Sequence, residues 1–125
     1  MEIHESAEDY LEAILILSER NGNVRSIDIA NYLGYSKPSV SIAMKKLREN
    51  GYVSVDEHGH LSLEPSGMEV ANHIYERHRV LGRMLQSIGV SEDVAMADAC
   101  KIEHDLSDET FDRIKEHMVR YEGEL

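Results

Sequence analysis

The chain lacks the features of a secreted or membrane-spanning protein. It has a single cysteine, Cys100, so no disulfide can form within its 125 residues, and a lone thiol fits a reducing compartment. No apolar run approaches the ~20 residues that a membrane-spanning helix needs. The amino-terminal segment MEIHESAEDY contains neither the basic region nor the apolar stretch of a signal peptide. We therefore expect a cytoplasmic protein.

The chain also lacks internal repeats, low-complexity tracts and linkers rich in proline, glycine or serine. A chain of this length buries about two-thirds of its unfolded surface and needs no disulfide scaffold. It is long enough for one compact unit, or for two very small ones that share a core.

Charge is distributed unevenly along the chain. The formal net charge is −11 at pH 7, which argues against nucleic-acid binding because proteins that bind nucleic acid usually carry a basic surface. Residues 37–48 are the exception, since they include Lys37, Lys45, Lys46 and Arg48 and no acidic residue. The segment is either a solvated helix face or a surface for DNA.

Signals for helix starts and stops predict three helices in the amino-terminal half, over about residues 6–21, 26–33 and 37–50. Ser6 is the expected N-cap of the first helix, and Gly34 ends the second. Pro38 is compatible with the first turn of the third. Residues 52–55 and 61–63 then alternate with period two around a turn, which predicts a β-hairpin. Three helices and a hairpin indicate a winged helix-turn-helix.

Three further helices are predicted after the hairpin. The longest begins at the capping-box match Ser66-x-x-Glu69 and can run to Ile88, and Ser91 and Ser107 are expected to cap the next two. Their apolar stripes are too numerous for one small monomer to bury, so we expect a homodimer. The predicted fold is mainly α with a small β-hairpin: a winged helix-turn-helix in residues 1–65 and a helical dimerisation domain in residues 66–125.

Three potential metal ligands share one helical face. Cys100, Glu103 and His104 are spaced i, i+3 and i+4, and a thiol, a carboxylate and an imidazole form a donor set of intermediate softness. The alternative is a buried cysteine beside an exposed polar pair at the helix end. His78 lies in the apolar stripe of the long helix. It is either a histidine of the core or a metal ligand.

Two carboxylates, Asp9 and Glu12, share a face of the first helix at i and i+3. Asp9 also fits the capping-box position after Ser6, and Glu12 could simply face solvent. Each of these signals is weak when taken alone.

Five segments together resemble the diphtheria-toxin-repressor family of metal-dependent regulators, most closely its short branch of manganese transport regulators. They are EDYLE at 8–12, YSKPSVS at 35–41, LEPSG at 63–67, RHR at 77–79 and CKIEHDLS at 100–107. They occur in the order and with the spacing of the family from about residue 6 to residue 107. The SH3-like domain of longer members is expected to be absent, since the chain ends at Leu125.

The resemblance implies a transcriptional repressor of metal homeostasis genes, with Fe(II) or Mn(II) as co-repressor. The implied metal ligands are Asp9, Glu12, His78, Cys100, Glu103 and His104. Cys100 matches the iron branch, whereas Asp9 departs from it, so the identity of the metal stays open. Gly82 and Met96 stand where the iron branch has further ligands, so its ancillary site is expected to be missing or altered.

The resemblance also implies operator DNA as the partner of the third helix. Base-edge contacts are expected from Ser36, Pro38, Ser39 and Ile42, and phosphate contacts from Lys37, Lys45, Lys46 and Arg48.

Other functions remain open. One is a winged-helix regulator that senses a small molecule or an oxidant through Cys100, and another is a metalloenzyme. The sequence contains no HExxH motif, nucleophile elbow or phosphate loop, so no enzyme is expected. A protein-interaction module without a DNA role is disfavoured by the basic segment.

Overall fold

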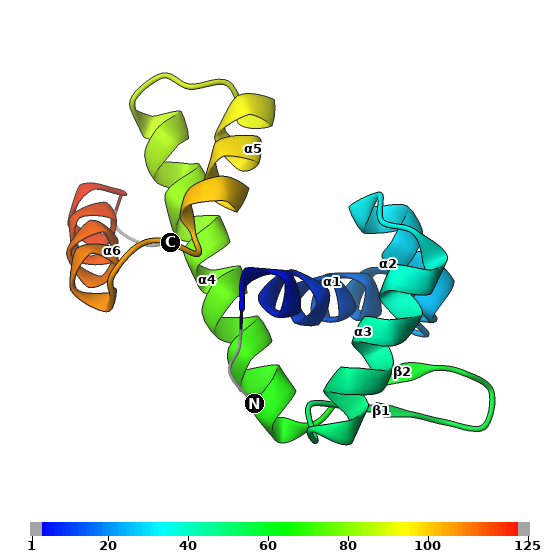
Figure 1. The fold of residues 1–125 in the computed structure, drawn as a ribbon. Coiled ribbons are helices and arrows are strands. Elements are labelled where there is room, and N and C mark those ends of the chain that lie inside the picture. Colours follow the sequence, from blue (N-terminus) through cyan, green and yellow to red (C-terminus); the bar gives the residue numbers. More distant parts are fainter. Residues whose placement is uncertain (1–3, 123–125) are drawn as a thin grey trace. The chain divides into compact units, whose positions relative to one another are not determined.

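The computed structural model describes residues 4–122, which form six helices and one two-stranded hairpin (Figure 1). The elements are α1 (Glu5–Asn21), α2 (Ser26–Leu33), α3 (Lys37–Glu49), β1 (Val53–Val55), β2 (Leu61–Leu63), α4 (Pro65–Ser87), α5 (Glu92–Ile102) and α6 (Asp108–Glu122). The predicted fold class, mainly α with a small hairpin, is confirmed. The chain divides into two compact units, the first up to Asn72 and the second from His73 onward. No helix of the described part is long and apolar enough to cross a membrane.

Helix α1 begins earlier than predicted. His4 occupies the N-cap position and its carbonyl accepts from the Glu8 amide at 3.0 Å, so Ser6 lies inside the helix and its predicted N-cap role is wrong. Glu5 and Glu8 in the first turn complement the helix dipole. The helix ends at Asn21, as predicted, and the φ of +83° at the following Gly22 suits a residue without a Cβ.

Helices α2 and α3 and the hairpin follow the prediction closely. Gly34 adopts the left-handed conformation that ends α2, and Ser36 caps α3. The antiparallel register pairs Val53 with Leu63 and Val55 with Leu61. The turn between the two strands, seen at the end of the hairpin in Figure 1, forms the wing of the winged helix.

The first unit is closed by the start of α4. The predicted capping role of Ser66 is wrong: α4 already begins at Pro65, and the Ser66 hydroxyl donates to the Gly51 carbonyl at 2.9 Å. Gly67 lies against the Tyr52 carbonyl, where an added Cβ would be only 2.2 Å from the oxygen. The core beneath is apolar, and its fully buried members include Leu11, Ile14, Val24, Ile29, Val40, Leu47 and Val53.

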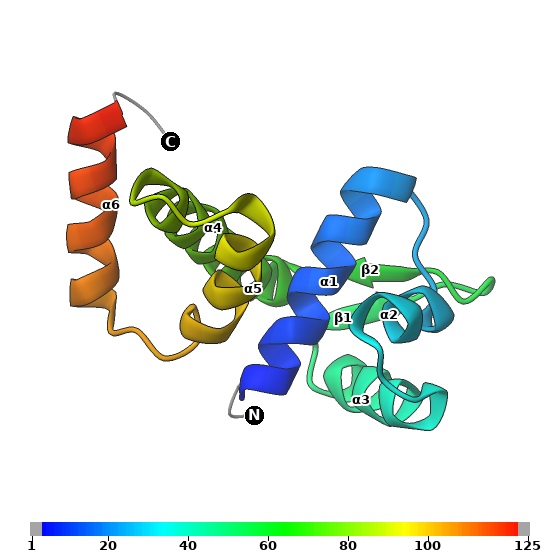
Figure 2. The ribbon, with the colours of Figure 1, turned by 90° about the horizontal axis from the view of Figure 1, so that it is seen from above.

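The second unit consists of the rest of α4 with α5 and α6. Helices α4 and α5 lie side by side and are joined by a short turn (Figure 2). Ser91 precedes α5 as predicted, and Ser107 caps α6 by accepting from the Thr110 amide at 3.1 Å. Helix α6 packs through Phe111 and Met118 on Val80 of α4, with Met84 and Ile114 at the edge of this cluster.

Candidate metal and DNA sites

The residues predicted to contact DNA lie on the exposed side of α3. They are Ser36 at its N-cap and Lys37, Pro38, Ser39, Ile42, Lys45, Lys46 and Arg48 within it. Ile42 is 69% exposed, although it is apolar. The opposite side of the helix, formed by Val40, Met44 and Leu47, is buried. Core packing therefore leaves the basic side of α3 open to a partner.

The first turn of α3 carries no acidic residue. The Ser36 hydroxyl accepts from the Ser39 amide at 3.3 Å and donates to the Ser39 hydroxyl at 2.8 Å. The positive end of the helix dipole is thus not offset by a nearby carboxylate of α3. Such a helix end favours a phosphate group.

The two predicted ligands of α1 differ in exposure. Asp9 is partly buried, whereas Glu12 is only 7% exposed, among the apolar residues of the helix. A charged carboxylate in such a place costs free energy, which positive charge or hydrogen-bond donors must offset. The burial of Glu12 contradicts the alternative that it simply faces solvent.

Tyr10 lies between these carboxylates and contacts the segment that leads into α3. Its ring meets the ring of Tyr35 edge to face, with centroids 5.7 Å apart, and Tyr35 directly precedes the α3 N-cap. Burial raises the pKa of Tyr10 above its usual value, and the neighbouring Tyr35 and Asp9 raise it further. Helix α1, which carries Asp9 and Glu12, is therefore in direct contact with the residue before the α3 N-cap, within one unit.

Three of the predicted ligands meet at the junction of α4 and α5. His78 Nδ1 lies 2.9 Å from Glu103 Oε2, and His104 Nε2 lies 3.6 Å from Glu103 Oε1. The Glu103 side chain is fully buried and that of His104 is 3% exposed. Within residues 4–122, Glu103 Oε1 has no hydrogen-bond partner. A fully buried carboxylate oxygen in this position is suited to a cation.

Cys100 joins this cluster from the surface. Its sulfur and a carboxylate oxygen of Glu103 are within 4.8 Å of each other. Cys100 is exposed and Glu103 is buried, so the alternative of a buried cysteine beside an exposed polar pair is wrong. The helical turn that ends α5 at Ile102 carries Glu103 inward beneath α4.

The donors at this junction fit a divalent transition metal. Imidazole, carboxylate and thiol groups are its usual ligands, and the mixture is intermediate in softness. The buried Glu103 oxygen also favours such an ion, because a bound cation would give it a partner. His78, Glu103, His104 and Cys100 are the residues of the second unit that could hold such an ion.

Gly82 and Met96, the positions at which the iron branch has its ancillary ligands, pack against each other. A Cβ added at Gly82 would lie 2.8 Å from Met96 Cε and 3.0 Å from its sulfur. Neither residue offers an oxygen or nitrogen side-chain donor.

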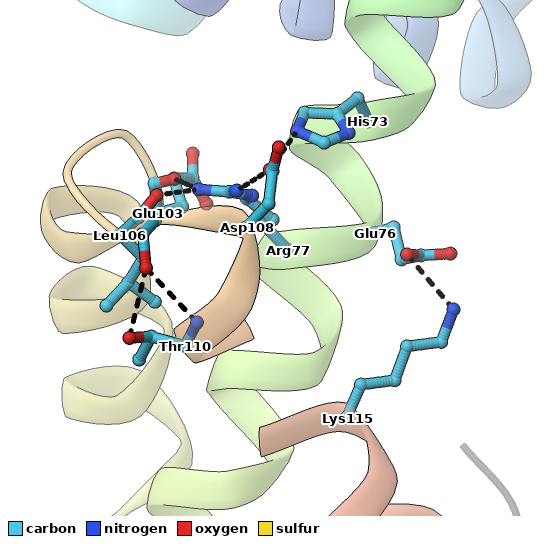
Figure 3. A network of polar contacts seen from close by, with 9 residues as sticks. His73, Glu76, Arg77, Glu103, Leu106, Asp108, Thr110 and Lys115 are labelled. Carbon is cyan, nitrogen blue, oxygen red and sulfur yellow. Dashed lines mark hydrogen bonds and ion pairs between the residues drawn. The ribbon is translucent and has the colours of Figure 1, made fainter. Parts of the chain in front are cut away.

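Arg77 contacts the candidate site although no motif of the sequence predicts a role for it. Its guanidinium reaches the loop between α5 and α6 and bonds there to the Glu103 carbonyl at 3.1 Å (Figure 3). A signal for it exists in the sequence: Arg77 stands three residues after Ile74, in the buried stripe of α4. A charged residue in that stripe indicates a buried polar partner.

Two family profiles together match almost the whole chain. Residues 2–61 match the iron dependent repressor, N-terminal DNA binding domain. Residues 64–122 match the iron dependent repressor, metal binding and dimerisation domain. The DNA-binding match contains α3, and the second match contains the cluster around Glu103.

Curated relatives agree with these matches. The HTH-type transcriptional regulator MntR of Geobacillus kaustophilus is 38% identical over 116 residues, which cover 93% of this chain and 82% of the relative. An HTH-type transcriptional regulator of Methanocaldococcus jannaschii is 33% identical over 97% of this chain and 98% of its own length.

Solved structures show the same fold. A manganese-dependent transcriptional repressor in complex with manganese superimposes with a TM-score of 0.82 at 32% identity, over 90% of this chain and 52% of that one. The IdeR protein of T. acidophilum gives a TM-score of 0.80 at 28% identity, over 94% and 55%. This chain spans about half the length of these solved structures. The chain belongs to the iron-dependent repressor family, whose members are metal-dependent, DNA-binding transcriptional repressors and not enzymes.

Proposed function

We propose that the chain represses transcription as a homodimer on operator DNA when Fe(II) or Mn(II) is bound to Asp9, Glu12, His78, Cys100, Glu103 and His104. The observation that carries this proposal is the fully buried Glu103 carboxylate, with one oxygen against His78 and the other without a hydrogen-bond partner among the described residues. Action on operator DNA would place the protein in the cytoplasm.

The ligands control the pH range in which the site works. Cys100 must bind as a thiolate and His78 and His104 as neutral imidazoles, so metal binding should weaken as the pH falls toward the histidine range. A bound ion would supply the positive charge that lets the carboxylates of both units share one site. Without that charge, Asp9, Glu12 and Glu103 would repel one another.

The contact between Tyr10 and Tyr35 connects ligand binding to DNA binding. Tyr10 follows Asp9 and precedes Glu12 by two residues, and its ring meets Tyr35 just before the recognition helix α3. Fixing α1 on the second unit would therefore fix α3 as well. In a dimer, two such helices must lie about 34 Å apart to enter successive major grooves. A coupling of roughly 1–3 kcal/mol, about 5- to 150-fold in affinity, is typical of such switches.

Exposed apolar residues of the second unit support the homodimer. Ile88, Val94 and Tyr121 are more than half exposed, at 73%, 51% and 76%. The family match to this unit is a dimerisation domain. We assign DNA binding to residues 1–65 and metal binding with dimerisation to residues 66–125.

The donor set favours Fe(II), with Mn(II) next. A thiolate with histidine and carboxylates suits Fe(II), whereas the names of the relatives and of the solved repressor point to Mn(II). Zn(II), Co(II) and Ni(II) should also bind in vitro, because the general affinity order favours them over both. Replacement of Cys100 by alanine tests the preference for Fe(II) over Mn(II), because loss of the thiolate should weaken Fe(II) binding more than Mn(II) binding.

A DNA-binding titration tests the proposal. A fluorescent duplex carrying the promoter of the chain's own gene is titrated with protein in EDTA, in Mn(II) and, without oxygen, in Fe(II). We expect binding to be 5- to 150-fold tighter with the active metal. Glu103→Gln should abolish this response, and Glu109→Gln, on the exposed first turn of α6, is the matched control.

Two results would contradict the proposal. Affinity that is the same in EDTA and in metal would exclude metal control. Affinity that responds to peroxide, and no longer does so in Cys100→Ser, would favour the oxidant sensor instead, for which the exposure of Cys100 is the supporting observation.

A further inference from the structure

We infer that Arg77 is the positioning residue of the metal site: it fixes the main chain of Glu103 so that the Glu103 carboxylate stays against His78. The effect on metal binding rests on the proposed function. The effect on the structure of residues 103–108 does not, so the two can be tested separately.

Arg77 binds three groups through one guanidinium. Its side chain is only 5% exposed, and Nη1 donates to the carbonyl oxygens of Glu103 at 3.1 Å and Leu106 at 2.6 Å. Nη2 donates to Asp108 Oδ1 at 2.6 Å. Figure 3 shows the guanidinium directed from α4 toward this loop. One side chain of α4 thus holds the end of α5, the loop after it and the start of α6.

The Glu103 carbonyl belongs to the C-cap residue of α5, and the Leu106 carbonyl lies in the loop after it. The last carbonyls of a helix lack intrahelical partners and need other donors. The Arg77 guanidinium donates to the Glu103 carbonyl there, with a positive charge that the helix C-terminus also favours, and gives a second donor to the loop carbonyl of Leu106. Its Cζ also lies over the Phe111 ring, 5.2 Å from the centroid, so the guanidinium has an aromatic contact as well. A lysine side chain has neither the several donors in fixed geometry nor the planar group of arginine.

Glu103 is held between two neighbouring residues of α4. Arg77 holds its carbonyl, and His78 holds its carboxylate at 2.9 Å. Because both belong to one helix, the rotamer of Glu103 is constrained from both ends. Its other carboxylate oxygen then faces His104 at 3.6 Å. Ligand geometry of this kind depends on such supporting contacts, whose loss typically weakens metal binding 10- to 100-fold.

The three contacts of Arg77 are not equally protected from solvent. The Asp108 side chain is 81% exposed, and its Oδ1 also lies 3.8 Å from His73 Nε2. Water therefore screens the ion pair between Arg77 and Asp108. The two carbonyl contacts are buried or partly buried. Loss of the carbonyl contacts should therefore matter more than loss of the Asp108 contact.

Variants of the full chain test the inference. Arg77→Lys keeps the charge but loses the two-pronged donor group, and Asp108→Asn removes the negative charge from the exposed contact alone. Arg113→Lys is the matched control, because Arg113 forms an exposed ion pair with Glu116 at 3.0 Å on the same unit. Circular dichroism melts fix a temperature at which every variant is folded. Mn(II) affinity is then measured by calorimetry, and Co(II) is added as a probe whose visible spectrum reports ligand geometry.

We expect Arg77→Lys to bind Mn(II) about 10- to 100-fold more weakly and to give an altered Co(II) spectrum. Asp108→Asn should lose only a few-fold, and Arg113→Lys should match the wild type. In Arg77→Ala, millimolar guanidinium ion should partly restore Mn(II) affinity, because it can occupy the space that the side chain leaves. A role limited to stability would change neither the spectrum nor the response to guanidinium.

Wild-type Mn(II) affinity with an unchanged Co(II) spectrum in folded Arg77→Lys would overturn the inference. If the wild type binds neither ion, the proposed function fails instead, and amide exchange in the metal-free protein decides the role of Arg77. Arg77→Lys should then exchange at least 10-fold faster than the wild type over residues 103–108. Unchanged protection there would contradict the inference.

Discussion

The two units of the molecule bury different kinds of residue. The first is built on an apolar core, in which Leu11, Ile14 and Val24 are fully buried. In the second, charged groups lie at the centre: Arg77 is 4% exposed and Glu103 is fully buried. Apolar burial depends little on pH or on ions, whereas buried charges depend on what neutralises them. The first unit, in which Glu12 is the one buried charge among the described residues, therefore depends mainly on rigid apolar packing, and the second depends on buried charges that a cation can alter.

The largest expected effect on this contrast comes from substitutions at two glycines of α4. Gly67→Ala, in the first unit, places a Cβ 2.2 Å from the Tyr52 carbonyl oxygen, and the backbone cannot move aside cheaply. We expect a loss of about 3 kcal/mol or more in the free energy of unfolding. Gly82→Ala, in the second unit, meets only the flexible end of Met96 and should cost less than about 1.5 kcal/mol. Urea unfolding followed by circular dichroism measures both, and equal losses would contradict the difference in rigidity.

The next effect concerns Glu103. Glu103→Gln removes the charge but keeps the shape, so Mn(II) affinity should fall on the order of 100-fold. The metal-free protein should melt at the same or a higher temperature, because the buried charge is gone. Calorimetry and a thermal melt give the two values. A strong loss of metal-free stability would show that Glu103 is mainly a structural ion-pair partner of His78.

A smaller effect is expected at the DNA surface of the first unit. Lys46→Ala should lower DNA affinity several-fold, equally for operator and unrelated duplexes, because phosphate contacts carry no sequence information. The slope of log affinity against log salt should decrease by about 1. Fluorescence anisotropy at several salt concentrations measures both. A change in operator preference would show that Lys46 contacts a base.

The smallest effect concerns the wing, where the first unit does contain a pH-sensitive carboxylate. Backbone hydrogen bonds from His60 at 2.9 Å and His58 at 2.8 Å hold the pKa of Asp56 below its ordinary value, the former being the larger cause. A lowered folded-state pKa stabilises the wing above the pKa of the unfolded chain. That contribution is lost as the pH falls through the lowered value.

Amide shifts of His58 and His60 should therefore titrate with a midpoint below that of a free aspartate, about 3.9. Asp56→Asn should abolish this titration and leave the melting of the first unit nearly unchanged. A midpoint at or above 3.9 would contradict the account of the wing.

Most of the fold could be predicted from local patterns. The alternation in 52–63 and the stop signal at Gly34 depend on neighbouring residues alone, and the structure agrees with both. Two predicted N-caps, Ser6 and Ser66, are wrong, and the cause at Ser66 is non-local. Ser66 matches a capping box, but its hydroxyl donates to Gly51, fifteen positions away in the chain. A short sequence motif cannot predict a contact between residues so far apart in the chain.

For the candidate site, the sequence predicts which residues could be ligands, but not how they are arranged. Helical spacing correctly places Cys100 and Glu103 on one side of α5, yet it cannot tell which of them is buried. The position of Arg77 in an apolar stripe indicates a buried partner, but the partners themselves belong to a loop that folds back on α4. Contacts between distant segments determine both the burial of Glu103 and the partners of Arg77.

Anomalous diffraction from crystals grown with Mn(II) tests the central claim most directly. The account predicts one strong peak within bonding distance of Glu103 and His78 and of at least one carboxylate from Asp9 and Glu12. A peak bound by residues of the second unit alone, or no peak at Glu103, would contradict it.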